Sequence, residues 1–389
     1  MRVYPISAAP VETSFESGTH WAQPAHDYRA GKRMVSAQLT HLQTPISTSL
    51  PRAPPSMDAP VNFLCMYLFL GQKYLVYPAA YEPRPYGLFA GRTSTGNLSY
   101  DKLTVTTPDG VKLACFVFAH TEESLVKDWT THDSIADDLD FFNREHPEYP
   151  KITEAASKAR ATIIYYHKTL DRAVANLCHA ASLFKLGYNV VVAEYRGFGE
   201  SEGGKANEKG LRIDGQAVFD TVLRDPYLSK THLVLYGSAV GGAVAIDVAS
   251  RNPSRVSRVI VANTFTSIPS ALRHNLPILG HLLCIFSVNQ WNSGKRLKHI
   301  PVTTPILMLS ARRDRIVNYR SMEALWEAAQ HRGEQDASDD SKPRPVNDVF
   351  KPFFSAGHES LEYRHDYWKI VDDFLKDLED APPVPKSDS

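Results

Sequence analysis

The chain has 389 residues, of which 43% are hydrophobic and 22% charged. This composition is typical of a globular protein with a sizeable core and excludes a wholly disordered chain. The chain has equal numbers of basic and acidic residues, 43 of each. Proteins that bind nucleic acids usually have an excess of basic residues, so this balance argues against a nucleic-acid partner. The four scattered cysteines form no CxxC pair, so we expect neither a metal site nor a disulfide scaffold. They are Cys65, Cys115, Cys178 and Cys284.

The amino-terminal part of the chain is predicted to lie outside the folded domain. Residues 1–58 are rich in Pro, Ser and Thr and show no sustained periodicity, so we expect a disordered tail without a secretory signal. The apolar run 63–70 is too short to cross a bilayer, which requires about 20 residues. Two interpretations of region 59–99 remain open: a segment that packs on the core, or an interfacial anchor followed by a linker.

Region 100–380 is predicted to form one α/β domain. Two β-rich runs flank Asp109 and Gly110, which indicates a hairpin over 103–118. Short apolar runs typical of strands covered on both faces then alternate with helical stretches, which predicts a mostly parallel sheet with helices on both faces. The expected strands are 162–166, 190–193, 233–236, 259–261, 305–309 and 349–354; the helices are 172–186, 209–223, 242–250, 319–331 and 367–378. The polar regions 120–160 and 331–347 are interpreted as surface insertions.

The most informative segment, 233–246, predicts a strand, a tight glycine-flanked turn and a helix. It has the glycines of the G-x-S-x-G pattern at Gly237 and Gly241, but the middle position, where this pattern places a nucleophile, holds Ala239. The next amide, that of Val240, is expected to help form an oxyanion hole. The glycine spacing matches no nucleotide-binding motif, so no cofactor is expected.

Two further residues follow predicted strands in the order that an α/β-hydrolase triad requires. Asp314 is expected to be the acid and His358 the base. Two other hydroxyl groups could be considered as nucleophiles. Ser238 precedes the turn's apex and should point away from the cleft, and Thr169 has no visible activating base.

Several stretches in combination make the chain resemble a known family between about residues 72 and 375. They are 72–78, 194–201, 237–246, 263–268, 305–317 and the Gly357-His358 pair. On these motifs the chain is similar to the fungal bud-emergence (bem-type) family of α/β-hydrolase-fold serine hydrolases, which are close to the type 13 α/β-hydrolase-domain proteins. The resemblance implies an α/β-hydrolase fold with an apolar cap at about 267–299. It also implies an endomembrane-associated hydrolase of acyl esters or thioesters, although a cytoplasmic location stays open.

The resemblance places the family's nucleophile on Ala239, its acid on Asp314 and its base on His358. Family members have a His-Gly-Asn-Ala-Gly oxyanion loop, and here residues 167–171 read His-Lys-Thr-Leu-Asp, which puts Lys168 at an oxyanion position without glycines. We therefore predict a protein that is inactive or strongly impaired as given, either a natural pseudoenzyme or a Ser-to-Ala variant. The alternatives are an active hydrolase in its unsubstituted form and a non-catalytic ligand-binding or scaffold protein. An acyl or lipid-like small molecule and a peripheral membrane contact are the expected partners.

Overall fold

The structure is a computed structural model that describes residues 71–74, 76–81, 100–126, 152–275, 278–332 and 347–378. These residues belong to one compact unit, Met57–Ser389. The predicted tail 1–58, the apolar run 63–70 and most of both predicted insertions lie outside the described residues. In the described ranges, no helix has the length and apolar character needed to cross a membrane.

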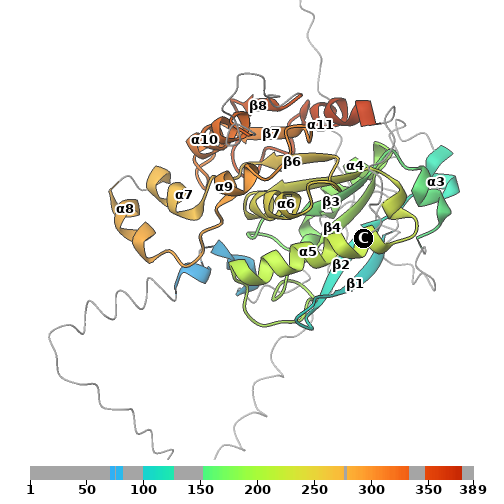
Figure 1. Cartoon of the computed structure of the whole chain (residues 1–389), viewed down its shortest axis with the longest axis horizontal. Coiled ribbons are helices and arrows are strands. Elements are labelled where there is room, and N and C mark those ends of the chain that lie inside the picture. The colour runs from blue at the N-terminus through green and yellow to red at the C-terminus, as the bar shows by residue number, and fades with distance from the viewer. Residues whose placement is uncertain are drawn as a thin grey trace, which may run out of the picture. The chain divides into compact units, whose positions relative to one another are not determined.

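A single eight-stranded sheet forms the centre of the domain, in the order β1-β2-β4-β3-β5-β6-β7-β8 (Figure 1). Strand β2 is antiparallel to both of its neighbours, and the other paired strands are parallel. The strands are β1 (Asp101–Thr106), β2 (Lys112–Phe118), β3 (Thr162–Tyr166), β4 (Asn189–Ala193), β5 (Leu233–Ser238), β6 (Arg258–Ala262), β7 (Ile306–Ala311) and β8 (Val349–Phe353). This arrangement confirms the predicted α/β-hydrolase fold, and the hairpin and the six later strands lie within a few residues of their predicted bounds.

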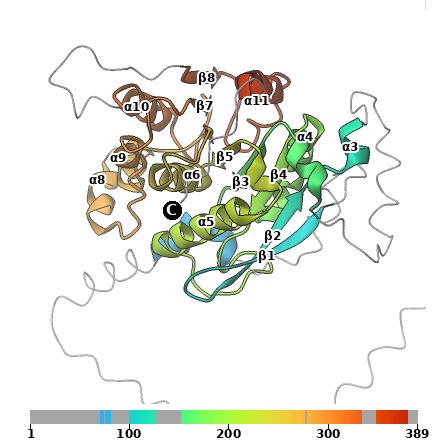
Figure 2. The ribbon, with the colours of Figure 1, turned by 45° about the vertical axis from the view of Figure 1, so that its right-hand side comes forward.

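Helices cover both faces of the sheet (Figure 2). One buried cluster joins the sheet to α5, α6 and α10, and a second joins it to α4 and α11. The helices are α3 (Glu122–Val126), α4 (Leu177–Lys185), α5 (Glu208–Arg224), α6 (Val240–Arg251), α7 (Ile268–Asn275), α8 (Leu279–Leu283), α9 (Ser293–Leu297), α10 (Tyr319–Gln330) and α11 (Tyr367–Leu375). Short 3₁₀ turns complete the described chain: η1 (Pro78–Ala80), η4 (Glu154–Lys158), η5 (Ala173–Asn176), η6 (Leu228–Lys230), η7 (Cys284–Phe286) and η9 (Lys376–Leu378).

The two-residue period of the strands assigns their side chains to one layer or the other. In β5, Leu233 and Leu235 belong to the α5–α6 cluster, whereas Val234 and Tyr236 belong to the α4–α11 cluster. Every residue of β5 is buried, which explains why this strand is continuously apolar rather than alternating in the sequence.

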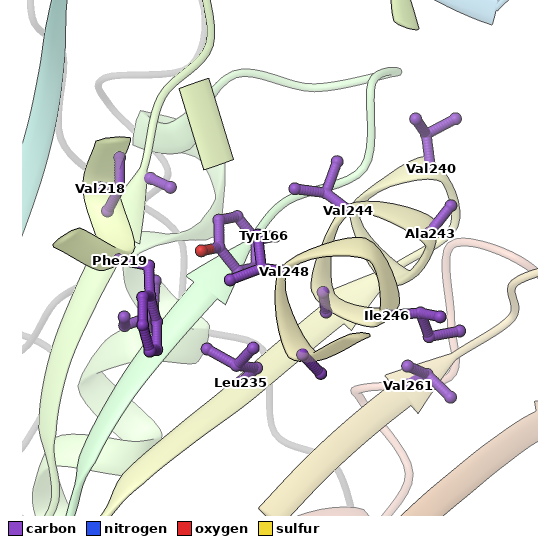
Figure 3. Close-up of a cluster of buried hydrophobic side chains, with 14 of the residues drawn as sticks. Tyr166, Val218, Phe219, Leu235, Val240, Ala243, Val244, Ile246, Val248 and Val261 are labelled. Carbon is purple, nitrogen blue, oxygen red and sulfur yellow. The ribbon is translucent and has the colours of Figure 1, made fainter. Parts of the chain in front are cut away.

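Helix α6 packs directly on the centre of the sheet (Figure 3). Its valine and alanine side chains, among them Val244 and Val248, lie close to Tyr166 and Leu235 of the strands below. The approach is close because a Cβ atom on Gly241 would lie 2.0 Å from the carbonyl oxygen of Tyr166. Glycine is therefore required at this position for the helix to start where it does.

The end of the region predicted as anchor or core-packing segment is anchored to the domain. Tyr77 is fully buried, and its hydroxyl donates a 2.8 Å hydrogen bond to Asn289 and accepts one of 3.0 Å from the indole of Trp291. The Ala79 N–H donates to the Thr169 carbonyl. Residues 76–81 thus pack on the core and on the segment predicted as the cap; the division of the chain into tail, segment, domain and cap stays a prediction.

The first prediction concerns the contact at Gly241. Gly241→Ala should lower the free energy of unfolding by at least about 3 kcal/mol, because the added methyl group meets main-chain atoms that cannot rotate away. Urea denaturation followed by circular dichroism measures this change. Gly204→Ala is the matched control, since no atom lies within 4 Å of the new Cβ. A stable Gly241→Ala protein would contradict the close approach.

Candidate active site

The sharp turn between β5 and α6 has the backbone geometry of a nucleophile elbow. Ala239 forms its apex with φ 51° and ψ −118°, a conformation that strains any residue with a Cβ. The Ala239 N–H donates a 2.9 Å hydrogen bond to the Ala262 carbonyl, and the Thr264 hydroxyl donates one of 2.7 Å to the Ala239 carbonyl. These bonds hold the strained apex in place, and its side chain is a methyl group.

Asp314 and His358 meet at the carboxyl ends of β7 and β8, as the sequence order predicts. Atom Nδ1 of His358 lies 2.7 Å from Oδ2 of Asp314. The other oxygen, Oδ1, accepts hydrogen bonds from the N–H groups of Ile316 at 2.7 Å and Val317 at 2.8 Å. These two main-chain bonds fix the orientation of the carboxylate independently of the imidazole. Because a carboxylate only accepts, Nδ1 must carry the proton in this pair.

The second ring nitrogen of His358 is left without a bonding group. Its Nε2 atom is buried and has no hydrogen-bond partner among the described residues. In an intact triad this nitrogen takes the proton of the nucleophile. The acid and the base are therefore brought together in this protein, and their catalytic roles stay predictions.

Neither neighbouring hydroxyl group contacts the imidazole. Ser238 continues the face of Val234 and Tyr236, and its Oγ lies 3.5 Å from a carboxylate oxygen of the buried Glu362. The Thr169 hydroxyl donates to the Val76 carbonyl. Each hydroxyl therefore has a contact other than His358, whose Nε2 has no hydrogen-bond partner among the described residues.

The loop after β3, predicted to carry part of the oxyanion hole, is held by a buried histidine–glutamate pair. Nε2 of His167 lies 2.8 Å from Glu194, and its Nδ1 lies 2.9 Å from the Lys168 carbonyl. Glu194 also accepts the N–H of Ala173 at 3.1 Å, so it connects the loop to the start of η5. On the other side of the apex, α6 begins at Val240, whose N–H belongs to the first helical turn and has no acceptor within the helix.

The side chain of Lys168 is buried beside this site. Its Nζ donates to Glu359 at 2.5 Å and lies 3.4 Å from Asp171. Burial alone would lower the pKa of Lys168, but the carboxylates of Glu362, Asp171 and Glu359 together raise that pKa above its ordinary value. Lys168, at the predicted oxyanion position, thus carries a positive charge, and its ammonium group is paired with the carboxylates of Glu359 and Asp171.

Three residues of this neighbourhood were not identified as site residues from the sequence. Glu194 and Glu362 are buried, and Glu359 pairs with Lys168 directly after the histidine. A glutamate at the end of an otherwise apolar strand, as Glu194 is, would have been the available signal. Within the described ranges, no group of three or more His, Cys, Asp or Glu side chains could hold a metal ion; the expected absence of cofactors stays a prediction.

The strain at the apex leads to a stability prediction. Ala239→Gly should raise the free energy of unfolding by about 1 kcal/mol, because relief of roughly 1–3 kcal/mol of strain exceeds the roughly 0.5–1 kcal/mol entropic cost of glycine. Equilibrium urea denaturation measures the change. As a control, Ala243→Gly in the regular part of α6 should lower stability. Loss of stability at both positions would show that the apex is unstrained.

Two buried histidines predict how stability depends on pH. Burial lowers the pKa of His179 from 6.5 to about 4, and the charge of Lys168 acts in the same direction. Burial likewise lowers the pKa of His120, which stacks on Phe184 with ring centroids 4.1 Å apart, to about 4. Between pH 6.5 and about 4 the unfolded chain binds more protons than the folded one, so stability should fall with falling pH. The loss should approach roughly 3 kcal/mol for each histidine.

Urea denaturation across this pH range tests the prediction. His179→Phe removes a titrating group and keeps an aromatic ring, so the slope of stability against pH should become shallower. His365→Phe, at an exposed position, is the control. An unchanged slope in His179→Phe would contradict the assignment.

The chain is similar to several known proteins. Residues 157–299 match the family model Hydrolase_4, described as serine aminopeptidase, S33. The chain is 29% identical to protein bem46 of Schizosaccharomyces pombe over 67% of its own length and 75% of that protein. It is 34% identical to the uncharacterized membrane protein YNL320W of Saccharomyces cerevisiae over 49% of its own length and 62% of that protein.

A solved structure shows the same fold. An esterase from Pyrococcus furiosus superposes with a TM-score of 0.50 at 19% identity, over 76% of this chain and 96% of that one. The sequence relatives, the matched family model and the eight-stranded sheet all agree with the predicted resemblance. These findings support the predicted resemblance to the bem46-type family, and the fold is that of an α/β-hydrolase.

Proposed function

We propose that this protein binds acyl esters or thioesters in a serine-hydrolase-type site and hydrolyses them poorly or not at all as the chain stands. The observation that carries the proposal is the residue at the apex of the elbow. Ala239 occupies the strained conformation of a nucleophile, and its methyl group can form no acyl-enzyme intermediate.

The acid–base half of the site supports the acyl-transfer chemistry. The 2.7 Å contact between Asp314 and His358 orients the imidazole, and Nε2 is left available to accept a proton. With no nucleophile, this base could at most activate water. Removing one triad member lowers kcat by about 10⁴- to 10⁶-fold in serine proteases, which sets the expected scale of the impairment.

The oxyanion half of the site supports loss of activity by a second route. The loop at 167–171 lacks glycines. The ammonium of Lys168 donates a hydrogen bond to Glu359, so this side chain is held by a carboxylate. The N–H of Val240 remains at the start of α6 as one donor for a developing oxyanion. A site with one donor of the usual pair would stabilise a tetrahedral intermediate less than an intact site does.

Two forms of the proposal differ in the role of this loop. The intact Asp314–His358 pair favours an active hydrolase in which only the apex residue has been replaced. The substituted loop favours a non-catalytic protein that binds an acyl ligand or acts as a scaffold. The solved relative named above is an esterase, and acyl esters are therefore the first substrate class to test.

The deciding experiment restores the missing hydroxyl. Ala239→Ser should leave the fold unchanged, and hydrolysis of a short acyl ester or thioester is then measured as kcat/KM. If the loop is competent, kcat/KM should rise by at least about a thousandfold over the unaltered chain. If the loop is a second lesion, Lys168→Gly should be needed in addition.

Two variants control this experiment. His358→Ala in the Ala239→Ser protein should abolish the gain, whereas Ser238→Ala should leave it intact because Ser238 faces Glu362. Rapid turnover by the unaltered chain that His358→Ala removes would contradict the proposal.

A further inference from the structure

Helices α7 and α8 of the cap segment lie at the rim of the domain, away from the sheet (Figures 1 and 2). In and beside α8 and η7, the exposed fractions are 92% for Ile278, 53% for Leu282, 74% for Ile285 and 52% for Val288. A cap that served only as a packed helix would bury such residues. Contiguous exposed apolar residues of this kind mark interaction surfaces.

A second element joins this surface from the start of the described chain. The Gln72 amide donates to the Phe286 carbonyl and accepts the Val288 N–H at 2.9 Å. Tyr74, two residues further, is 53% exposed. We define the cap patch as Tyr74 together with the four aliphatic residues Ile278, Leu282, Ile285 and Val288.

The cap sequence carries an excess of basic residues, one of which, Arg296, pairs with Glu208 and Asp247. From Asn263 to Arg313 the sequence contains six Lys or Arg residues and no Asp or Glu, although the whole chain is neutral. Arg273 lies against the patch, with Nη1 3.4 Å from the Cys284 sulfur. Lys73 lies over the rings of Tyr74 and Tyr81, 4.9 and 5.1 Å from their centroids. Apolar side chains flanked by basic ones suit the interface of an anionic bilayer.

The course of the chain indicates the same occupant. The hydrogen bonds of Gln72 hold the start of the described chain beside the cap patch. In the sequence, the apolar run 63–70 directly precedes this point, so apolar sequence and apolar surface meet at Gly71. We propose that the cap patch docks on the surface of an anionic phospholipid bilayer, a function separate from catalysis.

Vesicle flotation of the full chain tests this proposal. The protein should float with vesicles of phosphatidylcholine and phosphatidylserine and bind less to phosphatidylcholine alone. Replacing Ile278, Leu282, Ile285 and Val288 by serine should weaken binding at least about tenfold, because burial of one aliphatic side chain alone is worth roughly that factor. These side chains are exposed, so the variant should fold normally.

A matched control changes exposed apolar residues elsewhere. Serine replacements of Val126, Val349, Phe354 and Tyr363, which are 85%, 38%, 71% and 71% exposed, should leave vesicle binding unchanged. Equal binding by the patch variant and the unaltered chain, or equal binding to neutral and anionic vesicles, would overturn the proposal. So would absence of binding by the unaltered chain.

A fluorescence measurement distinguishes a bilayer from other occupants. Ile285→Trp should add emission typical of an exposed indole in buffer, which shifts to the blue and is quenched by brominated lipid when anionic vesicles are added. Phe354→Trp should show no such shift. Blue emission in buffer alone would show that another part of the chain or a second copy covers the patch, and would overturn the proposal.

Discussion

The close approach of α6 to the centre of the sheet is the constraint on which the site depends. A Cβ atom on Gly237 would lie 2.2 Å from the carbonyl oxygen of Gly241, and a Cβ on Gly241 would lie 2.0 Å from that of Tyr166. With glycine at both positions, β5 can turn into α6 within one residue. That residue, Ala239, adopts a positive φ, and α6 begins directly after it with N–H groups that have no acceptor within the helix. The backbone geometry of a nucleophile elbow is thus set by these two glycines and does not require a hydroxyl at position 239.

The Asp314–His358 pair and the loop after β3 are held in place by different interactions. Asp314 is fixed by two main-chain N–H groups and in turn orients His358, so the imidazole is preorganised. At the loop after β3, the buried ammonium of Lys168 is neutralised by surrounding carboxylates, one of them on the residue that follows the histidine. The loop is therefore tied by an ion pair to the residue that follows His358, a contact that a glycine-rich loop could not make.

Most of the fold could be predicted from the sequence because its signals are local. Short β-branched runs predicted β3 to β8, and Asp109-Gly110 predicted the turn between β1 and β2. The positions of Asp314 and His358 after predicted strands predicted that these two side chains meet, since parallel strands end at one edge of a sheet. The pairing of Lys168 with Glu359 spans 191 positions and carries no local signal. Nor does periodicity distinguish an exposed apolar turn from a buried one, so the solvent exposure of Ile278 and Ile285 became evident only from the structure.

The central claim is that neither Ser238 nor Thr169 replaces the hydroxyl that position 239 lacks. The most direct measurement is the intact mass of the unaltered chain after incubation with a fluorophosphonate, which reacts covalently with an activated serine or threonine. The account predicts no increase in mass, because Ser238 contacts Glu362 and Thr169 donates to a main-chain carbonyl. A stoichiometric adduct that maps to either residue and disappears in His358→Ala would contradict it.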